Sequence, residues 1–279
     1  MTPFQSMLLV STLVGLATGL GAIPTLFGAR VSHRTYDAAL GLAGGIMVAA
    51  SVFGLIIPGS EQGALSAVMV GVFLGGFGLL AGNRVLPHLH TEYHRRRGHG
   101  GGEIDDGDDH GSDVEFDGSD GGSDDAALDD RLRRAALVGG AITLHNAPEG
   151  LAMGIAYASG LEEVAIVLAI VIALQNVPDG FAFAIPVAQS GVSTPKVFLY
   201  TTLSGTVPQV IGSVFGFALV GIAQGIFPVA AGFAAGAMLA VVLREMVPSS
   251  HGHGYADAAT AAFLVGFVLL VVVDAAVGA

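Results

Sequence analysis

Long uninterrupted runs of apolar residues dominate the pattern of this sequence. Four of them contain no Asp, Glu, Lys or Arg, namely residues 2–29, 38–60, 62–83 and 197–243. A transmembrane helix needs about 20 such residues, and these runs lack the strict alternation of polar and apolar positions that is typical of membrane β-strands. The pattern therefore predicts an all-α polytopic membrane protein.

Turn-forming residues divide the apolar runs into eight predicted helices. The longest run exceeds one span and divides near residues 224–228, while Pro58-Gly59-Ser60, Gly160 and the stretch 191–195 mark further breaks. The predicted helices cover residues 4–28, 36–58, 63–86, 132–158, 163–189, 196–222, 227–249 and 256–277.

Composition supports this interpretation and excludes several other classes of protein. Charged residues make up 12% of the chain and the mean hydropathy is +0.70, whereas about 25% of the residues of a soluble domain are charged. The formal net charge of −12 is opposite to that expected of a nucleic-acid binder. The absence of cysteine excludes disulfides, thiolate catalysis and sulfur-ligated metal sites.

The distribution of the 11 basic residues predicts the orientation in the membrane. All of them flank or occupy the connections after the first, third, fifth and seventh predicted helices: Arg30, Arg34, Arg84, Arg95, Arg96, Arg97, Arg131, Arg133, Arg134, Lys196 and Arg244. Because positively charged connections stay in the cytoplasm, both termini are expected outside. An odd number of helices would break this segregation.

Residues 87–131 form the one sizeable hydrophilic segment. It combines histidines with a Gly/Asp-rich tract that has 13 acidic residues between Glu103 and Asp130. Such a composition cannot bury a core, so the sequence predicts a disordered cytoplasmic loop between a first part of the membrane domain, 1–86, and a second part, 132–279. The loop is interpreted either as a solvated linker or as a loose metal-collecting segment.

A polar motif occurs twice in the middle of predicted membrane helices. The fourth helix contains His145-Asn146-Ala147-Pro148-Glu149-Gly150, and the fifth contains Gln175-Asn176-Val177-Pro178-Asp179-Gly180. Ionisable groups in the hydrocarbon cost roughly 2.5–3.5 kcal/mol on insertion scales and usually mark function. The position-matched repeat is therefore a candidate functional site.

The spacing of the two motifs suits a divalent cation. Residues four apart share a helix face, which pairs His145 with Glu149 and Gln175 with Asp179. The prolines remove a helical hydrogen bond, which predicts kinked helices with free carbonyl oxygens. A short connection at Gly160 makes the helices antiparallel neighbours, so one imidazole, two carboxylates and three amides can face each other. These ligands suit Zn²⁺, Fe²⁺, Mn²⁺, Co²⁺ or Cd²⁺.

The paired motifs resemble those of the ZIP (Zrt-/Irt-like protein) family of divalent metal transporters. The Gln175-Asn176 start of the second copy is similar to the GufA-like prokaryotic branch. The resemblance covers nearly the whole chain and implies that one metal position consists of His145, Glu149, Gln175 and Asp179. It implies a second position from Asn146 and Asn176, which share Glu149 and Asp179, and a mobile group made of the first, fourth, fifth and sixth helices.

The sequence departs from the family pattern at two positions. Asp179 replaces the usual Glu, which shortens that ligand by one methylene. The sixth helix has Pro208-Gln209 where related sequences have a Glu-Pro that contributes to the second metal position. Gln209 is therefore a further candidate metal ligand, with an amide in place of the carboxylate.

Three further residues are candidate metal ligands on the resemblance. Glu245 and His251, at the end of the seventh helix, correspond to an exit site, with an ordinary Arg244–Glu245 boundary as the competing interpretation. Asp274, in the last helix, corresponds to an entrance position or to a solvated helix end. Asp37 is expected to be an interfacial charge.

The expected function is transport of a divalent transition metal from outside into the cytoplasm. Zinc is the leading candidate, and iron, manganese, cobalt and cadmium are the others. The protein is not expected to be an enzyme, and the metal is its substrate, with no organic cofactor. The expected partners are metal ions and the lipid bilayer of the cell membrane, with a homodimer as a candidate assembly and no nucleic acid. Two alternatives stay open: a proton-coupled carrier of an organic solute, and an intramembrane metallohydrolase.

Overall fold

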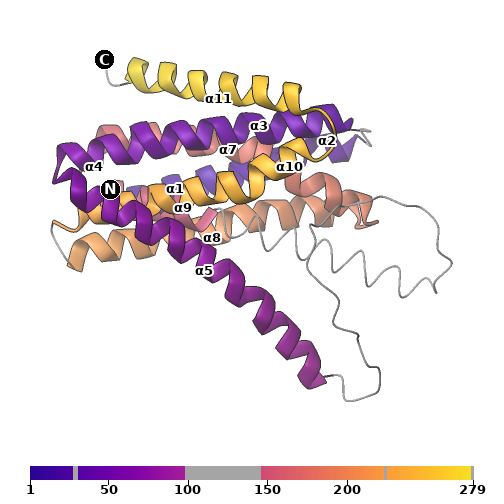
Figure 1. Cartoon of the computed structure of the whole chain (residues 1–279), viewed down its shortest axis with the longest axis horizontal. Helices are drawn as coiled ribbons and strands as arrows, with labels where there is room; N and C mark the ends of the chain where they lie inside the picture. The colour runs from indigo at the N-terminus through magenta and orange to yellow at the C-terminus, as the bar shows by residue number, and fades with distance from the viewer. Residues whose placement is uncertain (28–30, 98–145, 223–224, 278–279) are drawn as a thin grey trace.

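Helices account for all the regular secondary structure that the computed structural model describes, over residues 1–27, 31–97, 146–222 and 225–277 (Figure 1). An unlabelled helix over 146–158 lies between α5 and α7. The labelled elements are α1 (Pro3–Leu20), α2 (Ile23–Leu26), α3 (His33–Ala49), η1 (Ala50–Ile56), α4 (Ile57–Glu61), α5 (Leu65–Arg97), α7 (Glu162–Gln189), α8 (Thr194–Ile222), α9 (Phe227–Val241), η2 (Val242–Met246), α10 (Val247–His251) and α11 (Ala256–Val277).

Seven helices within the described residues are long and apolar enough to cross a membrane. Their positions agree closely with the prediction from the apolar runs. The remaining predicted span, 132–158, is described only over 146–158, because 132–145 lies outside the described residues. The helix preceding the predicted loop runs to Arg97 and not to residue 86, and loop residues 98–131 also lie outside the described part.

The first predicted helix is interrupted, because α1 ends at Leu20 and α2 begins at Ile23. Pro24 has no amide hydrogen to continue the helical bonding. Gly21 faces α7 so closely that a Cβ atom there would lie 2.2 Å from the Phe181 nitrogen. The interruption and the missing side chain together allow the end of α1 to pack against the backbone of α7.

Two π-helical segments continue a helix towards a proline. The first, η1, precedes Pro58 and the second, η2, precedes Pro248. Because proline cannot donate the usual hydrogen bond, a widened turn accommodates it without ending the helix. The second predicted helix consequently continues through Pro58 to Glu61.

The helices form two groups, within which the backbones touch. The first group comprises α1, helix 146–158, α7 and α8, and the second comprises α3, α5, α9 and α11 with their continuations. Gly71, Gly75, Gly232 and Gly236 bring α5 and α9 into backbone contact, and Gly41, Gly45 and Gly266 do the same for α3 and α11. Small residues of this kind allow close helix approach in membranes.

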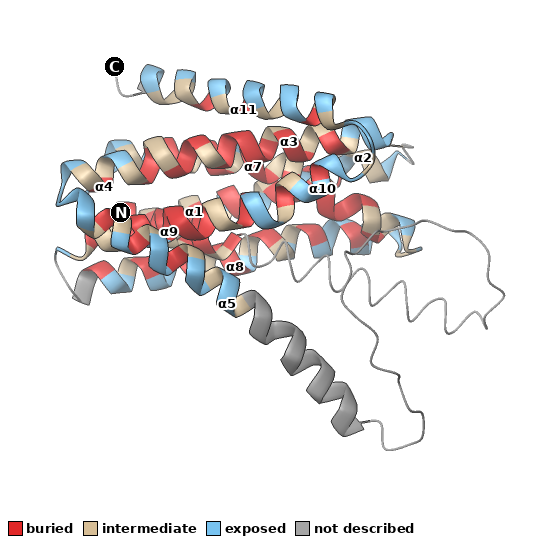
Figure 2. Ribbon diagram, in the orientation of Figure 1, coloured by how far each residue is buried: buried red, intermediate tan, exposed pale blue. Residues whose placement is uncertain are grey.

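Contact between the two groups is made by side chains. The α3–α7 contact belongs to the main apolar core, where Leu168 of α7 packs over Gly54 of η1. Figure 2 shows buried residues concentrated on α3, α7 and α9, while α5 and α11 have many exposed positions. The exposed apolar residues of α5 and α11 fit a surface that faces lipid.

Both ends of the described chain lie at the same end of the bundle. Figure 1 places the start of α1 and the end of α11 on one side, and α2 and α10 on the other.

Replacing Gly75 by Ala is expected to lower the thermal stability of the protein in detergent. A Cβ atom at Gly75 would lie 1.9 Å from the Phe233 carbonyl oxygen, so α5 and α9 would have to separate. Overpacking of this kind costs about 1–3 kcal/mol. Gly82→Ala is the matched control in the same helix, since nothing lies within 4 Å of its Cβ position. Equal melting temperatures for the two variants would contradict the backbone contact.

Candidate metal centre

Glu149 and Gln175 join helix 146–158 to α7 in the protein interior. Both side chains are fully buried, and the Gln175 Nε2 donates a hydrogen bond to Glu149 Oε1. Asp179, one turn further along α7, interacts electrostatically with the same carboxylate. Glu149 Oε2 and Gln175 Oε1 are buried and have no hydrogen-bond partner among the described residues. These oxygens are therefore available to a ligand.

Asn176 connects α7 to two other helices. Its Nδ2 donates to the main-chain oxygen of Val14 in α1 at 2.9 Å and to Gln209 Oε1 in α8 at 3.0 Å. One amide nitrogen thus satisfies acceptors on both neighbours. Its own oxygen, Oδ1, is buried and accepts no hydrogen bond from the described part of the chain.

Glycine brings helix 146–158 against α8 beside these side chains. A Cβ atom at Gly150 would lie 1.9 Å from the Gln209 carbonyl oxygen, and one at Gly212 would lie 2.3 Å from the Ala147 carbonyl oxygen. The Ser213 hydroxyl donates to the Gln209 carbonyl at 2.8 Å, so Ser11 of α1 donates to Ser213 at 2.6 Å. All four helices of the first group therefore meet around the paired motifs.

The charge of this region is negative. The buried charged side chains of the described residues are Glu149, Asp179 and Asp37, and none of them is Lys or Arg. Asp37 lies against His253 on the second group, 2.8 Å from its Nδ1. Two carboxylates in the hydrocarbon layer are costly without a counter-charge. A divalent cation would neutralise both of them.

The predicted ligands occupy different places in the structure. Asn146, Glu149, Gln175, Asn176, Asp179 and Gln209 are buried in the first group of helices, whereas His145 lies outside the described residues. Within the described residues no three His, Asp or Glu side chains gather around one point. The described part of the centre combines two carboxylates with amides, and the prediction for His145 stays open.

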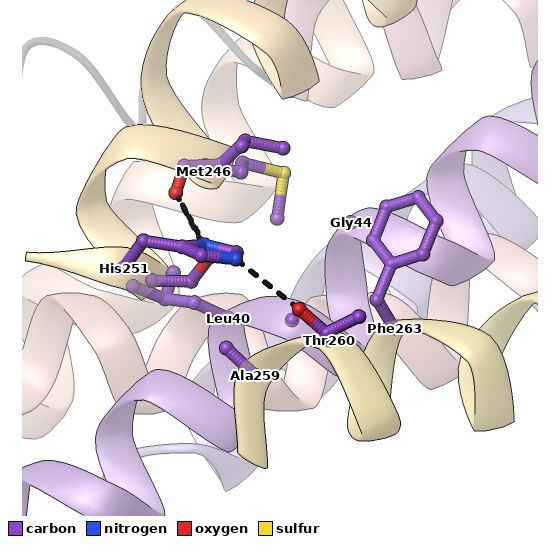
Figure 3. Close-up of a pocket in the computed structure, with 10 residues that line it drawn as sticks. Leu40, Gly44, Met246, His251, Ala259, Thr260 and Phe263 are labelled. Carbon is purple, nitrogen blue, oxygen red and sulfur yellow. Dashed lines mark hydrogen bonds between the residues drawn. The ribbon is translucent and has the colours of Figure 1, made fainter. Parts of the chain in front are cut away.

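His251 lies apart from this centre, beside a cavity of about 200 Å³ between α3, α10 and α11 (Figure 3). Its Nδ1 donates to the Val247 carbonyl at 2.9 Å, and its Nε2 lies within hydrogen-bond distance of the Thr260 hydroxyl, at 3.3 Å. A metal ion at His251 would have to displace one of these partners. Glu245 lies in η2, and Asp274 lies half-buried near the end of α11.

The structure shows several contacts around the candidate residues that were not predicted from the sequence. Asp37 is fully buried and hydrogen-bonded to His253, whose ring stacks on that of His33 with centroids 4.7 Å apart. The Val14 carbonyl and Ser11 of α1 were also missed. Ser11 and Thr18, seven residues apart and both buried, are the polar signal that marks this face of α1.

Comparison with known proteins identifies one family. The model of the family described as ZIP zinc transporter matches residues 4–274. The zinc transporter GufA of Myxococcus xanthus is 33% identical over 97% of this chain and 98% of its own length. The zinc transporter ZIPB of Bordetella bronchiseptica is 34% identical over 94% of this chain and 78% of its own length. Human zinc transporter ZIP11 is 38% identical over 52% of this chain and 44% of its own length.

Asn176→Asp is expected to lower the melting temperature of the metal-free protein. The substitution removes both donated hydrogen bonds and places carboxylate oxygens against two acceptors, Val14 O and Gln209 Oε1. Buried acceptors that lose their donors cost about 1–3 kcal/mol. Gln189→Glu, an amide-to-acid change at an exposed position of α7, is the control. A melting temperature equal to that of the control would contradict the assigned role of Asn176.

Proposed function

The chain belongs to the ZIP family of zinc transporters, and from that membership we propose that it carries Zn²⁺ into the cytoplasm through the centre between helix 146–158 and α7. Fe²⁺, Mn²⁺, Co²⁺ and Cd²⁺ are the other cations that this ligand chemistry accepts. The proposed ligands are His145, Glu149, Gln175 and Asp179, with the oxygens of Asn146 and Asn176 beside them.

The observation that carries the proposal is the pair of buried carboxylates among amide oxygens. Glu149 Oε2, Gln175 Oε1 and Asn176 Oδ1 are all buried without a hydrogen-bond partner among the described residues. Unsatisfied buried acceptors are costly, and a cation satisfies several of them together. Carboxylate, amide and imidazole ligands fit a small divalent cation and leave an organic solute few apolar contacts.

The proposed topology adds an eighth span, 132–158, to the seven described ones. With both termini outside, the connections after α2, α5, α7 and α10 face the cytoplasm of a cell-membrane protein. Metal would then enter past Asp274 and leave past Glu245 and His251. The common position of the two chain ends in Figure 1 supports an even number of spans.

Membership of a transporter family excludes the alternative that the protein is an intramembrane metallohydrolase. The protein is a transporter and not an enzyme. The proton-coupled carrier of an organic solute differs from a metal transporter in one measurable property, because chelation of metal would leave its transport unchanged.

Uptake of metal into proteoliposomes is the direct test. Wild-type protein is expected to take up Zn²⁺, with Cd²⁺, Fe²⁺, Mn²⁺ and Co²⁺ offered separately to define selectivity. Glu149→Gln and His145→Ala should each lower uptake by at least about tenfold, because each removes a ligand. Glu163→Gln, at the exposed start of α7, is the matched control for loss of one acidic group. Folded wild-type protein that takes up none of these metals would refute the proposal.

Uptake is also expected to fall as the pH on both sides of the membrane is lowered from about 7 to about 5, where imidazole becomes protonated. Metal ligands bind in their deprotonated form, so protonation of His145 or of the carboxylates competes with the cation. The measurement is initial Zn²⁺ uptake in proteoliposomes with equal pH on both sides, which removes any proton gradient. A steady rise in uptake over this range would contradict the expectation and favour a proton-coupled carrier.

A further inference from the structure

The main chain of α1 determines which way two buried amides point. The Val14 carbonyl can only accept a hydrogen bond, so it fixes the Nδ2 end of Asn176 towards α1. The same nitrogen meets Gln209, which must present its oxygen, Oε1, at 3.0 Å. The nitrogen of Gln209 therefore lies at the other end of the same planar amide group, on the side away from Asn176.

Gln209 thus carries a buried donor next to the candidate metal centre. The side chain is fully buried, and its Nε2 has no hydrogen-bond partner among the described residues. Its backbone lies against Gly150, the residue after Glu149. Turning the amide over would place two NH₂ groups against each other and leave Asn176 without its acceptor in α8, so the observed orientation is strongly preferred.

The charge of the centre sets a limit on the number of cations. Among the described residues the centre has two buried carboxylates, Glu149 and Asp179, whose two negative charges one divalent cation neutralises. A second divalent cation would leave a surplus of two positive charges in a low-dielectric environment. The hydrogen atoms of Gln209 Nε2 carry partial positive charge and would repel a cation placed beside them.

We propose that Gln209 restricts the centre to a single divalent cation, with its amide nitrogen donating to an oxygen atom in the shell of that cation and not ligating a second one. This inference rests on the proposed function, since it concerns the number of ions in the same centre. Gln209 is accordingly a specificity-determining residue, and its predicted role as a metal ligand is replaced by that of a hydrogen-bond donor.

The test is the number of Zn²⁺ ions bound per chain, measured by equilibrium dialysis of the full chain in detergent. Because the histidines and acids of 87–131 also bind metal, the count is taken relative to a Glu149→Gln/Asp179→Asn double variant, which keeps that segment. Wild type is expected to bind one Zn²⁺ ion more than the double variant. Gln209→Glu is expected to bind two more, because its carboxylate supplies a third negative charge. Gln62→Glu, an exposed amide-to-acid change outside the helices, should stay at one.

The outcomes separate the inference from the proposed function. If wild type binds two ions more than the double variant, the single-cation limit is overturned while the metal centre stays intact. A difference of one ion in both wild type and folded Gln209→Glu would show that Gln209 is not the restricting residue. A difference of zero in wild type would overturn the metal centre and the inference with it. Should Gln209→Glu not fold, the wild-type count of one or two still decides the limit.

Discussion

Backbone contact at glycine is the constraint on which the candidate centre depends. The side chains that meet there are short, and they reach one another because the helices that carry them touch. Gly150 lets the Gln209 carbonyl approach helix 146–158, and Gly180 and Gly21 do the same between α1 and α7, where a Cβ atom at Gly180 would lie 1.8 Å from the Thr18 carbonyl oxygen. A wider spacing would leave buried amides without partners, and the hydrocarbon layer offers no water to replace them.

This packing places two carboxylates in the interior, and no Lys or Arg is buried among the described residues. The two acidic side chains, Glu149 and Asp179, lie in the interior of the first group of helices. The amides that surround the carboxylates orient them and stabilise their charge in part, yet they add no positive charge. Asp37 illustrates the contrast, because His253 lies 2.8 Å from that buried carboxylate and can supply a proton. The centre therefore favours an external cation, which is the property a carrier needs.

The fold was largely predictable from the sequence, because each membrane helix must satisfy its own backbone and therefore appears as a local apolar run. The paired motifs were predictable for a similar reason, since ionisable residues stand out in such runs. The break after Leu20 and the continuation of α5 to Arg97 were not predicted, nor was the burial of Asp37. The break and the burial depend on neighbours distant in sequence, which are α7 for Gly21 and His253 for Asp37. The orientation of Gln209 is the clearest case, because it is set by a main-chain carbonyl at Val14 that no residue type reveals.

The division into two groups of helices connects the packing to the transport that we propose. Every described side chain of the centre belongs to α1, helix 146–158, α7 or α8, and the backbone contacts at glycine occur inside each group. Across the boundary, Gly54 meets only the side chain of Leu168, and one hydrogen bond runs from the Tyr36 hydroxyl of α3 to the Ala182 carbonyl of α7 at 3.4 Å. Interlocked backbones resist sliding, whereas an apolar side-chain contact can be exchanged for another at low cost. A cation held by one group alone would keep all its ligands if that group moved against the other, as alternating access requires.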